Sequence, residues 1–168
     1  MVNLLVMAFA ACFFVGAGDA LKEHTLDNGR IRVLLPGVPV ENYQKASFGP
    51  AMKNYTSKTA EGMFVVGSMD VPDAVGQTEE QIKTRLDAGK DQCLVSTKGK
   101  LLKETPIKLA DKYYGRELIV ELPATKEVLR SRYYLVDGRL YLLMVIGKTE
   151  FVNSETCEKF LDSLKVGK

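Results

Sequence analysis

The sequence predicts an α+β domain in which an antiparallel sheet of about six or seven strands packs against two main helices. Residues 100–148 form four strand-like segments joined by short links, which favour antiparallel pairing. Two other segments, starting at Thr78 and at Asn153 or Ser154, space their apolar residues as helices do. With 168 residues, 46% of them hydrophobic and 26% charged, the chain suits a single globular domain.

Residues 1–20 are expected to be a signal peptide. Residues 2–18 are apolar or small apart from Asn3, and the chain becomes polar at Lys22. This run is shorter than the ~20 apolar residues of a membrane-spanning helix, and small residues precede a cleavage site after Ala20. The sequence therefore predicts export to the periplasm or the extracellular space. Residues 21–168 would be the mature domain, with no transmembrane segment.

The three cysteines leave two questions open. Cys12 follows small residues that loosely resemble the box before a lipidated bacterial cysteine, but the apolar run continues past it, so a lipoprotein is the less favoured alternative. Cys93 and Cys157 remain after cleavage, in a compartment where disulfides persist. Each lies on an apolar helix stripe, so they are either a disulfide pair or two buried thiols.

The first strands of the domain are predicted at residues 31–35, 52–59 and 63–71. Residues 36–50 contain three of the six prolines and indicate a loop. Residues 63–66 are all apolar, as expected for a strand that is covered on both faces.

A helix is predicted to begin at Thr78, because Thr78 and Gln81 have the spacing of a capping box. Ile82, Leu86 and Cys93 then lie on one apolar stripe. A glycine within this helix, Gly89, should weaken it by about 1 kcal/mol relative to alanine.

Four further strands are predicted at residues 100–109, 116–122, 128–136 and 139–148. Asp137-Gly138 is a hairpin signal that places Tyr134 opposite Tyr141 and Tyr133 opposite Leu142. The last strand is apolar on both faces, which indicates a central position in the sheet.

The chain is predicted to end in a helix that runs from Asn153 or Ser154 to Val166. Its apolar stripe has helical spacing and consists of Cys157, Phe160, Leu161 and Leu164.

Four segments, taken in order, resemble exported bacterial proteins with a PsbP-like α/β/α sandwich, the fold shared by PsbP, Mog and DcrB. They are Tyr114–Glu117, Arg130–Leu135, Gly138–Val145 and Phe160–Leu164. The likeness covers about residues 25–166 and includes no catalytic signature. Since a shared fold warrants only an analogy about function, the resemblance implies a binding or assembly module. No manganese-, calcium- or Ran-binding motif accompanies it.

The composition excludes several familiar chemistries. One histidine, His24, and three cysteines are too few for a His-rich or Cys-rich metal site, so we expect no metal and no cofactor. A net charge of +2 does not favour nucleic acid as a partner. Residues 146–149 lack the upstream glycine of a phosphate-binding loop. His24 lies in a segment expected to be mobile, which is unsuitable for nucleophilic catalysis.

Arg130, Arg132 and Tyr134 share one face of a predicted strand and are the candidate ligand or partner surface. Arginine side chains bind carboxylate or phosphate groups through two parallel hydrogen bonds. The alternative is structural ion pairing across the sheet with Glu117 or Glu121.

The function expected from the sequence is therefore a non-catalytic binding or assembly module for a protein or cell-envelope partner. A small-molecule carrier with a cleft between sheet and helix comes second, and a carboxylate-based hydrolase third. An apolar pocket would favour the carrier, and an exposed aromatic or apolar patch would favour the binding module.

Overall fold

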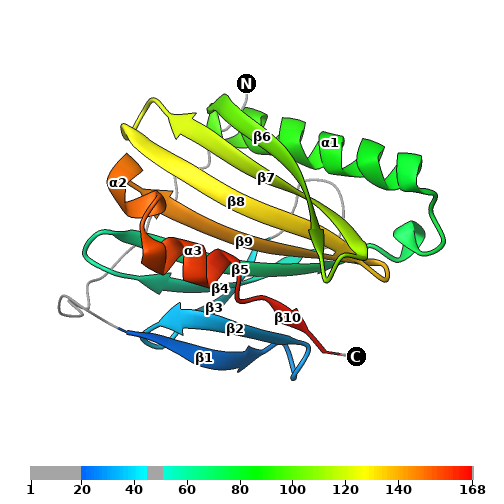
Figure 1. Ribbon diagram of the computed structural model, residues 1–168, viewed down its shortest axis with the longest axis horizontal. Coiled ribbons are helices and arrows are strands. Elements are labelled where there is room, and N and C mark those ends of the chain that lie inside the picture. Colours follow the sequence, from blue (N-terminus) through cyan, green and yellow to red (C-terminus); the bar gives the residue numbers. More distant parts are fainter. Residues whose placement is uncertain (1–19, 45–50, 168) are drawn as a thin grey trace.

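A computed structural model describes residues 20–44 and 51–167 of the chain (Figure 1). The main sheet has seven antiparallel strands, which are β3 (Val40–Gln44), β4 (Met52–Lys58), β5 (Gly62–Asp70), β6 (Lys100–Leu109), β7 (Tyr113–Leu122), β8 (Glu127–Val136) and β9 (Arg139–Gly147). Their spatial order is β3-β4-β5-β9-β8-β7-β6, so β3 and β6 form the two edges. The predicted α+β architecture with a central antiparallel sheet is confirmed.

A smaller sheet contains β1 (Leu21–Leu26), β2 (Ile31–Pro36) and β10 (Lys165–Val166), with β2 in the middle. The helices are η1 (Pro72–Ala74), α1 (Glu79–Thr97), α2 (Thr149–Val152) and α3 (Glu155–Leu161). None of the helices within residues 20–44 and 51–167 has the length and hydropathy needed to cross a membrane.

The main sheet is covered on both faces, because successive side chains of its central strands point to opposite sides. On β8, Tyr134 and Val136 join a core cluster with β2 and α3, whereas Tyr133 and Leu135 join a second cluster with Leu86 of α1. One face therefore packs against α1, and the other packs against the smaller sheet and α3 (Figure 1). The expected central position of β9 is confirmed.

The hairpin at Asp137-Gly138 has the predicted register, with Tyr134 opposite Tyr141 and Tyr133 opposite Leu142. Asp137 has φ 46° and Gly138 has φ 78°, so both turn residues adopt the left-handed conformation that this tight turn requires.

Helix α1 begins as predicted. The Thr78 side chain accepts a hydrogen bond from the Gln81 amide, and the Gln81 side chain accepts one from the Thr78 amide. Leu86 is buried against the sheet, and the hydroxyl of Tyr133 donates a hydrogen bond to the Leu86 carbonyl oxygen at 2.9 Å.

The last helix is shorter than predicted. Ser154 caps it as expected, but α3 ends at Leu161, and Lys165–Val166 pairs with β2 instead of extending the helix. The Ser163 hydroxyl accepts a hydrogen bond from the Leu34 amide and so fixes the chain beside β2 after the helix has ended. The predicted stripe of Cys157, Phe160, Leu161 and Leu164 is nevertheless buried throughout.

Besides β10, two strands were absent from the sequence prediction. Residues 21–26 form β1, and residues 40–44, within the expected loop, form β3. All five residues of β3 are exposed, so this strand lacks the alternation of apolar and polar residues that marks a strand in a sequence. His24, expected in a mobile segment, lies in β1 opposite Val33.

Of the two alternatives for Cys93 and Cys157, the structure has the free thiols and not the disulfide. Both cysteines are free thiols: Cys93 lies on α1, and Cys157 lies on α3 on the opposite face of the sheet. Burial raises the pKa of both thiols, as expected for cysteines that act as small apolar side chains. The predicted signal peptide and the lipidation candidate Cys12 lie outside the described residues.

Replacing Gly89 with alanine should raise the free energy of unfolding by about 1 kcal/mol, because alanine favours a helix interior more than glycine does. A Cβ atom at this position would meet only ordinary contact, 3.6 Å from Tyr133 Cε2. Urea denaturation measures the change. Gly115→Ala is the control, since its Cβ would lie 2.5 Å from the Tyr133 carbonyl oxygen and should destabilise the protein. A loss of stability in Gly89→Ala would contradict this account.

Candidate functional site

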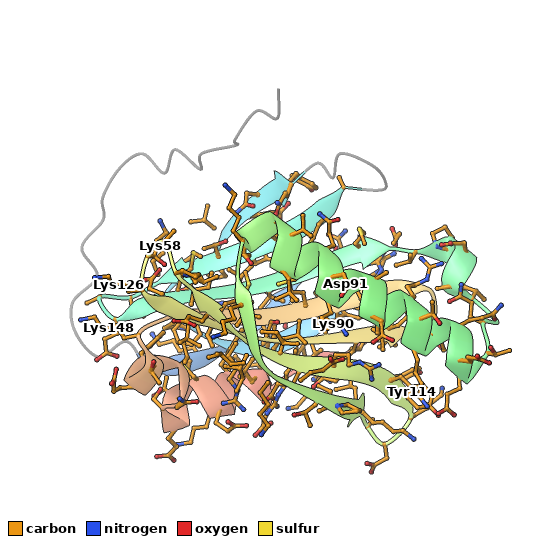
Figure 2. The ribbon with its side chains drawn as sticks, turned by 90° about the horizontal axis from the view of Figure 1, so that it is seen from above. Lys58, Lys90, Asp91, Tyr114, Lys126 and Lys148 are labelled. Atoms are coloured by element: carbon orange, nitrogen blue, oxygen red, sulfur yellow. The ribbon has the colours of Figure 1, made fainter. Side chains whose placement is uncertain are left out.

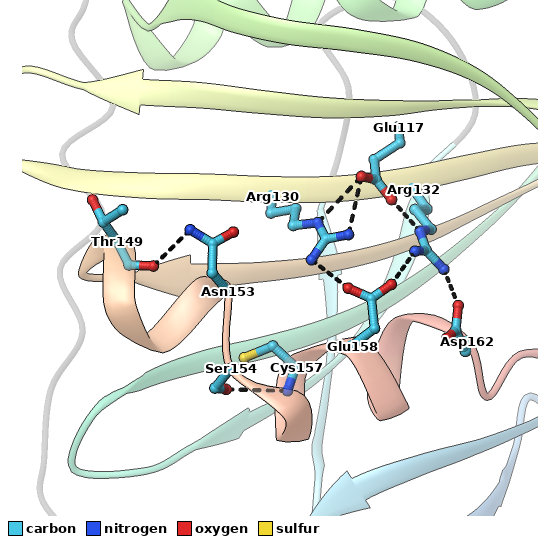
Figure 3. Close-up of polar contacts among 9 residues, drawn as sticks. All are labelled: Glu117, Arg130, Arg132, Thr149, Asn153, Ser154, Cys157, Glu158 and Asp162. Carbon is cyan, nitrogen blue, oxygen red and sulfur yellow. Dashed lines mark hydrogen bonds and ion pairs between the residues drawn. The ribbon is translucent and has the colours of Figure 1, made fainter.

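The three residues of the predicted surface lie on one face of β8, and that face is covered by α3 (Figure 3). Arg132 is opposite Glu117 of β7, whereas Glu121 is opposite Val128. Of the two glutamates considered as cross-strand partners, the structure thus places Glu117 beside the arginines.

Glu117 and Glu158 each bind both arginines. One oxygen of Glu117 accepts hydrogen bonds from Arg130 Nη2 at 3.0 Å and Nε at 3.3 Å, and its other oxygen binds Arg132. Glu158, on α3, accepts from Arg130 Nη1 and Arg132 Nη2, both at 2.6 Å. Asp162, at the end of α3, binds the remaining terminal nitrogen of Arg132. The group of five, shown in Figure 3, is hereafter the arginine network.

Three members of the arginine network are largely buried, and its charges are compensated internally. The side chains of Arg130, Arg132 and Glu117 are 11%, 13% and 11% exposed. Two guanidinium groups face three carboxylates, so an incoming anion would have to displace a carboxylate that is already bound. Ion pairs of these arginines with Glu117 are present, as the structural alternative expects, and Glu158 links both arginines to α3.

The charge state of Glu158 follows from its place in the arginine network. Burial would raise the pKa of Glu158, but the hydrogen bond and charge of Arg130, together with those of Arg132, hold it below the ordinary value of 4.5. The carboxylate is therefore ionised at neutral pH.

A cleft of about 340 Å³ lies beside the arginine network, between the ends of β6 and α3. Ile107, Leu109, Leu161 and Leu164 form much of its apolar lining. Its charged side chains, Arg132 and Asp162, bind each other. Lys108 also lines the cleft, but only with its backbone. Its side chain points to the opposite face of the sheet, where the ammonium nitrogen lies 4.7 Å from the centre of the Tyr114 ring.

A second buried ionic site connects the smaller sheet to the main sheet, and no sequence pattern predicted it. The carboxylate of Asp27, in the turn between β1 and β2, accepts hydrogen bonds from Arg139 Nη1 at 2.6 Å and from the Ser68 hydroxyl at 3.2 Å. Lys53 approaches the same carboxylate at 3.7 Å, and the Asp27 amide donates to the Tyr55 hydroxyl at 2.9 Å. These partners come from β4, β5 and β9, so Asp27 is a structural anchor.

Three lysines, Lys58, Lys126 and Lys148, lie toward the same end of the main sheet (Figure 2), on turns that Figure 1 shows at separate places along that end. The turns that hold them also contain Glu61, Glu127 and Glu150. Both signs of charge therefore occur at this end of the sheet.

No metal centre is formed by the described residues, since residues 20–44 and 51–167 contain no group of three or more His, Cys, Asp or Glu side chains that could hold an ion.

Three strongly exposed apolar side chains lie close together at the β3 edge. Val38 is 87% exposed, and Val40 and Tyr43 are each 67% exposed. They are three of the six large apolar side chains that are exposed among the described residues, and they fall within six positions of one another. We call Val38, Val40, Tyr43 and the free edge of β3 the β3 surface.

Charged residues border the β3 surface. Lys53 lies 3.3 Å from the Glu41 carboxylate and 5.7 Å from the centre of the Tyr43 ring. Burial would raise the pKa of Glu41, but hydrogen bonds with Tyr43 and Lys53 lower it below its ordinary value. Glu41 is thus a charged residue in the middle of an apolar edge.

No protein-family model and no curated protein matches this chain. Among solved structures, the α+β sandwich is similar to the solution structure of cyanobacterial PsbP (CyanoP) from Synechocystis sp. PCC 6803. The TM-score is 0.62 at 11% sequence identity, and the match covers 94% of this chain and 98% of that chain. The predicted PsbP-like fold is confirmed. At this level of identity the similarity shows the fold alone.

Replacing Glu158 with glutamine should lower stability at neutral pH and reduce its dependence on pH. A carboxylate whose folded pKa is depressed stabilises the protein above its unfolded pKa, and the contribution is lost as pH falls through the folded value. The side chain is 44% exposed, so solvent screening limits the effect to about 1 kcal/mol. Urea denaturation between pH 7 and pH 3 should show the two proteins converging below the ordinary pKa of 4.5. Glu150→Gln, on the exposed surface of α2, should follow the wild type, and an equal change in both variants would refute this role.

Proposed function

We propose that this chain is a non-catalytic, exported binding or assembly module that engages a protein partner through the β3 surface. The observation that carries the proposal is the concentration of Val38, Val40 and Tyr43 on one free edge of the main sheet. Export is supported by the signal-peptide pattern of residues 1–20.

The free edge supports protein binding for a physical reason. An edge strand has backbone N–H and C=O groups without a neighbouring strand, and a partner strand can pair with them. Main-chain hydrogen bonds then provide affinity, and side chains such as Val40 and Tyr43 add apolar contact area. Tyrosine is enriched in protein interfaces because it combines a large apolar ring with a hydroxyl group.

A small-molecule carrier is the second candidate, and the cleft beside the arginine network favours it. A volume of about 340 Å³ falls at the lower end of the range for ligand pockets. Because Arg132 and Asp162 bind each other, a ligand there would meet this ion pair as well as the apolar side chains of the cleft. Native mass spectrometry of the exported protein distinguishes this candidate, since a carrier would retain a small co-purifying mass.

The carboxylate hydrolase is the least supported candidate. Glu117 and Glu158 converge, but each binds both arginines, so they serve as ion-pair partners rather than as a general acid and base.

The proposal is tested by placing a photo-crosslinking amino acid at Tyr43 in the full chain, within cells that export it. We expect a discrete crosslinked species of defined mass, because the side chain would lie in the interface. Adding Val40→Asp should abolish that species, since a charge would be buried at the contact.

The matched control is the same crosslinker at Val95, which is 73% exposed on α1. No discrete species is expected from position 95. The same pattern from both positions, or none from position 43, would contradict the proposed function.

A further inference from the structure

The two edges of the main sheet differ in how they are protected against pairing. The β6 edge contains Pro106, lysines at positions 100, 103 and 108, and a shift in register between Leu101 and Lys103. Prolines, lysines and bulges are features by which proteins prevent strands from adding to a sheet. The β3 edge, Val40–Gln44, contains no proline or lysine and pairs with β4 in a continuous register. Within residues 20–44 and 51–167 no strand pairs with its outer side, so this edge can accept a further strand.

A second copy of the chain can pair with this edge only in certain registers. In a two-fold symmetric antiparallel pair, the axis is perpendicular to the sheet and the faces of the two copies coincide. The side chains of two paired residues point to the same face of the sheet, whereas successive side chains along one strand point to opposite faces. The two residues of each pair are therefore an even number of positions apart in the sequence, so the two-fold axis passes through a residue that lies opposite its own copy. For a strand of five residues, the central candidates are Glu41, Asn42 and Tyr43.

Charge and length select Asn42 among the three. Centring on Glu41 would place two carboxylates directly opposite each other, which is destabilising. Centring on Tyr43 would pair Val40 with residue 46, beyond the end of β3 at Gln44. Centring on Asn42 pairs all five residues, with Val40 opposite Gln44 and Glu41 opposite Tyr43.

The Asn42 register is also self-complementary in its chemistry. On one face, Glu41 of each copy would meet Tyr43 of the other, and Lys53 already lies beside both residues within one chain. The Glu41 carboxylate, the Tyr43 ring and the Lys53 ammonium group would thus alternate across the axis, and no two groups of the same charge would lie opposite each other. On the other face, Val40 would be covered by the aliphatic part of Gln44.

From these features we infer that a second copy of this chain occupies the β3 surface, through antiparallel pairing of two β3 strands about Asn42. This inference rests on the proposed function, because it names the partner for the same surface. The two main sheets would become one continuous sheet across the dimer axis.

The test uses two variants of opposite charge, Asn42→Lys and Asn42→Asp, in the protein recovered from its exported fraction. Analytical ultracentrifugation over a range of concentrations should show a dimer for the wild type. Each variant alone places like charges face to face at the axis and should weaken dimerisation by at least about 10-fold. An equimolar mixture of the two should regain the dimer, because lysine then faces aspartate.

Val95→Lys and Val95→Asp are the matched controls, since position 95 is equally open to solvent on α1, and both should dimerise like the wild type. Asn42 is exposed and its side chain donates only a 3.3 Å hydrogen bond to Thr56, so the variants should fold, as circular dichroism would verify. A monomeric wild type, single variants that dimerise normally, or a mixture that stays monomeric would overturn the inference.

Crosslinking at Tyr43 distinguishes failure of the dimer inference from failure of the proposed function. A monomeric protein that crosslinks to a different protein would refute the second copy while leaving the β3 surface as a docking site. A monomer without any discrete crosslink would refute both.

Discussion

The structure depends on the need to cover both faces of the main sheet. Its central strands are apolar on both sides, and each fully buried aliphatic or aromatic side chain contributes roughly 1.5–3 kcal/mol. Helix α1 buries one face with Leu86, and the smaller sheet and α3 bury the other with Ile31 and Phe160. In the described part of the chain the sheet ends in two edge strands, β3 and β6, which explains why the candidate interaction surface is an edge rather than a face.

The buried charged residues hold the covering elements against the main sheet. The arginine network lies where α3 meets β7 and β8, and Asp27 lies where the smaller sheet meets β4, β5 and β9. Both sites connect a covering element to the main sheet, and in both the charges are compensated within the protein. Breaking such a buried pair is costly because it leaves one charge without a partner. The ion pairs at these two sites account for the positions of the buried arginines and of Asp27, and no bound ligand is needed to explain them.

Features encoded locally in the sequence were predictable, and features that depend on distant elements were not. The Asp137-Gly138 hairpin and the Thr78 cap each follow from a few neighbouring residues, and both were predicted. Strand β3 was missed because an edge strand exposed on both faces has no periodic pattern. The pairing of Cys93 and Cys157 was left open because sequence does not specify on which side of the sheet a helix packs. The shared face of Arg130 and Arg132 was predictable, but their engagement by Glu158 required the position of α3.

The central claim is that this protein associates through the β3 edge of its main sheet. Amide hydrogen exchange, measured on the exported protein at low and high concentration, tests it most directly because it reports each edge separately. The account predicts that amides of Val40–Gln44 become slower to exchange as concentration rises, while those of Lys100–Leu109 at the opposite edge are unchanged. Protection that appears at the β6 edge instead, or no change at β3, would contradict it.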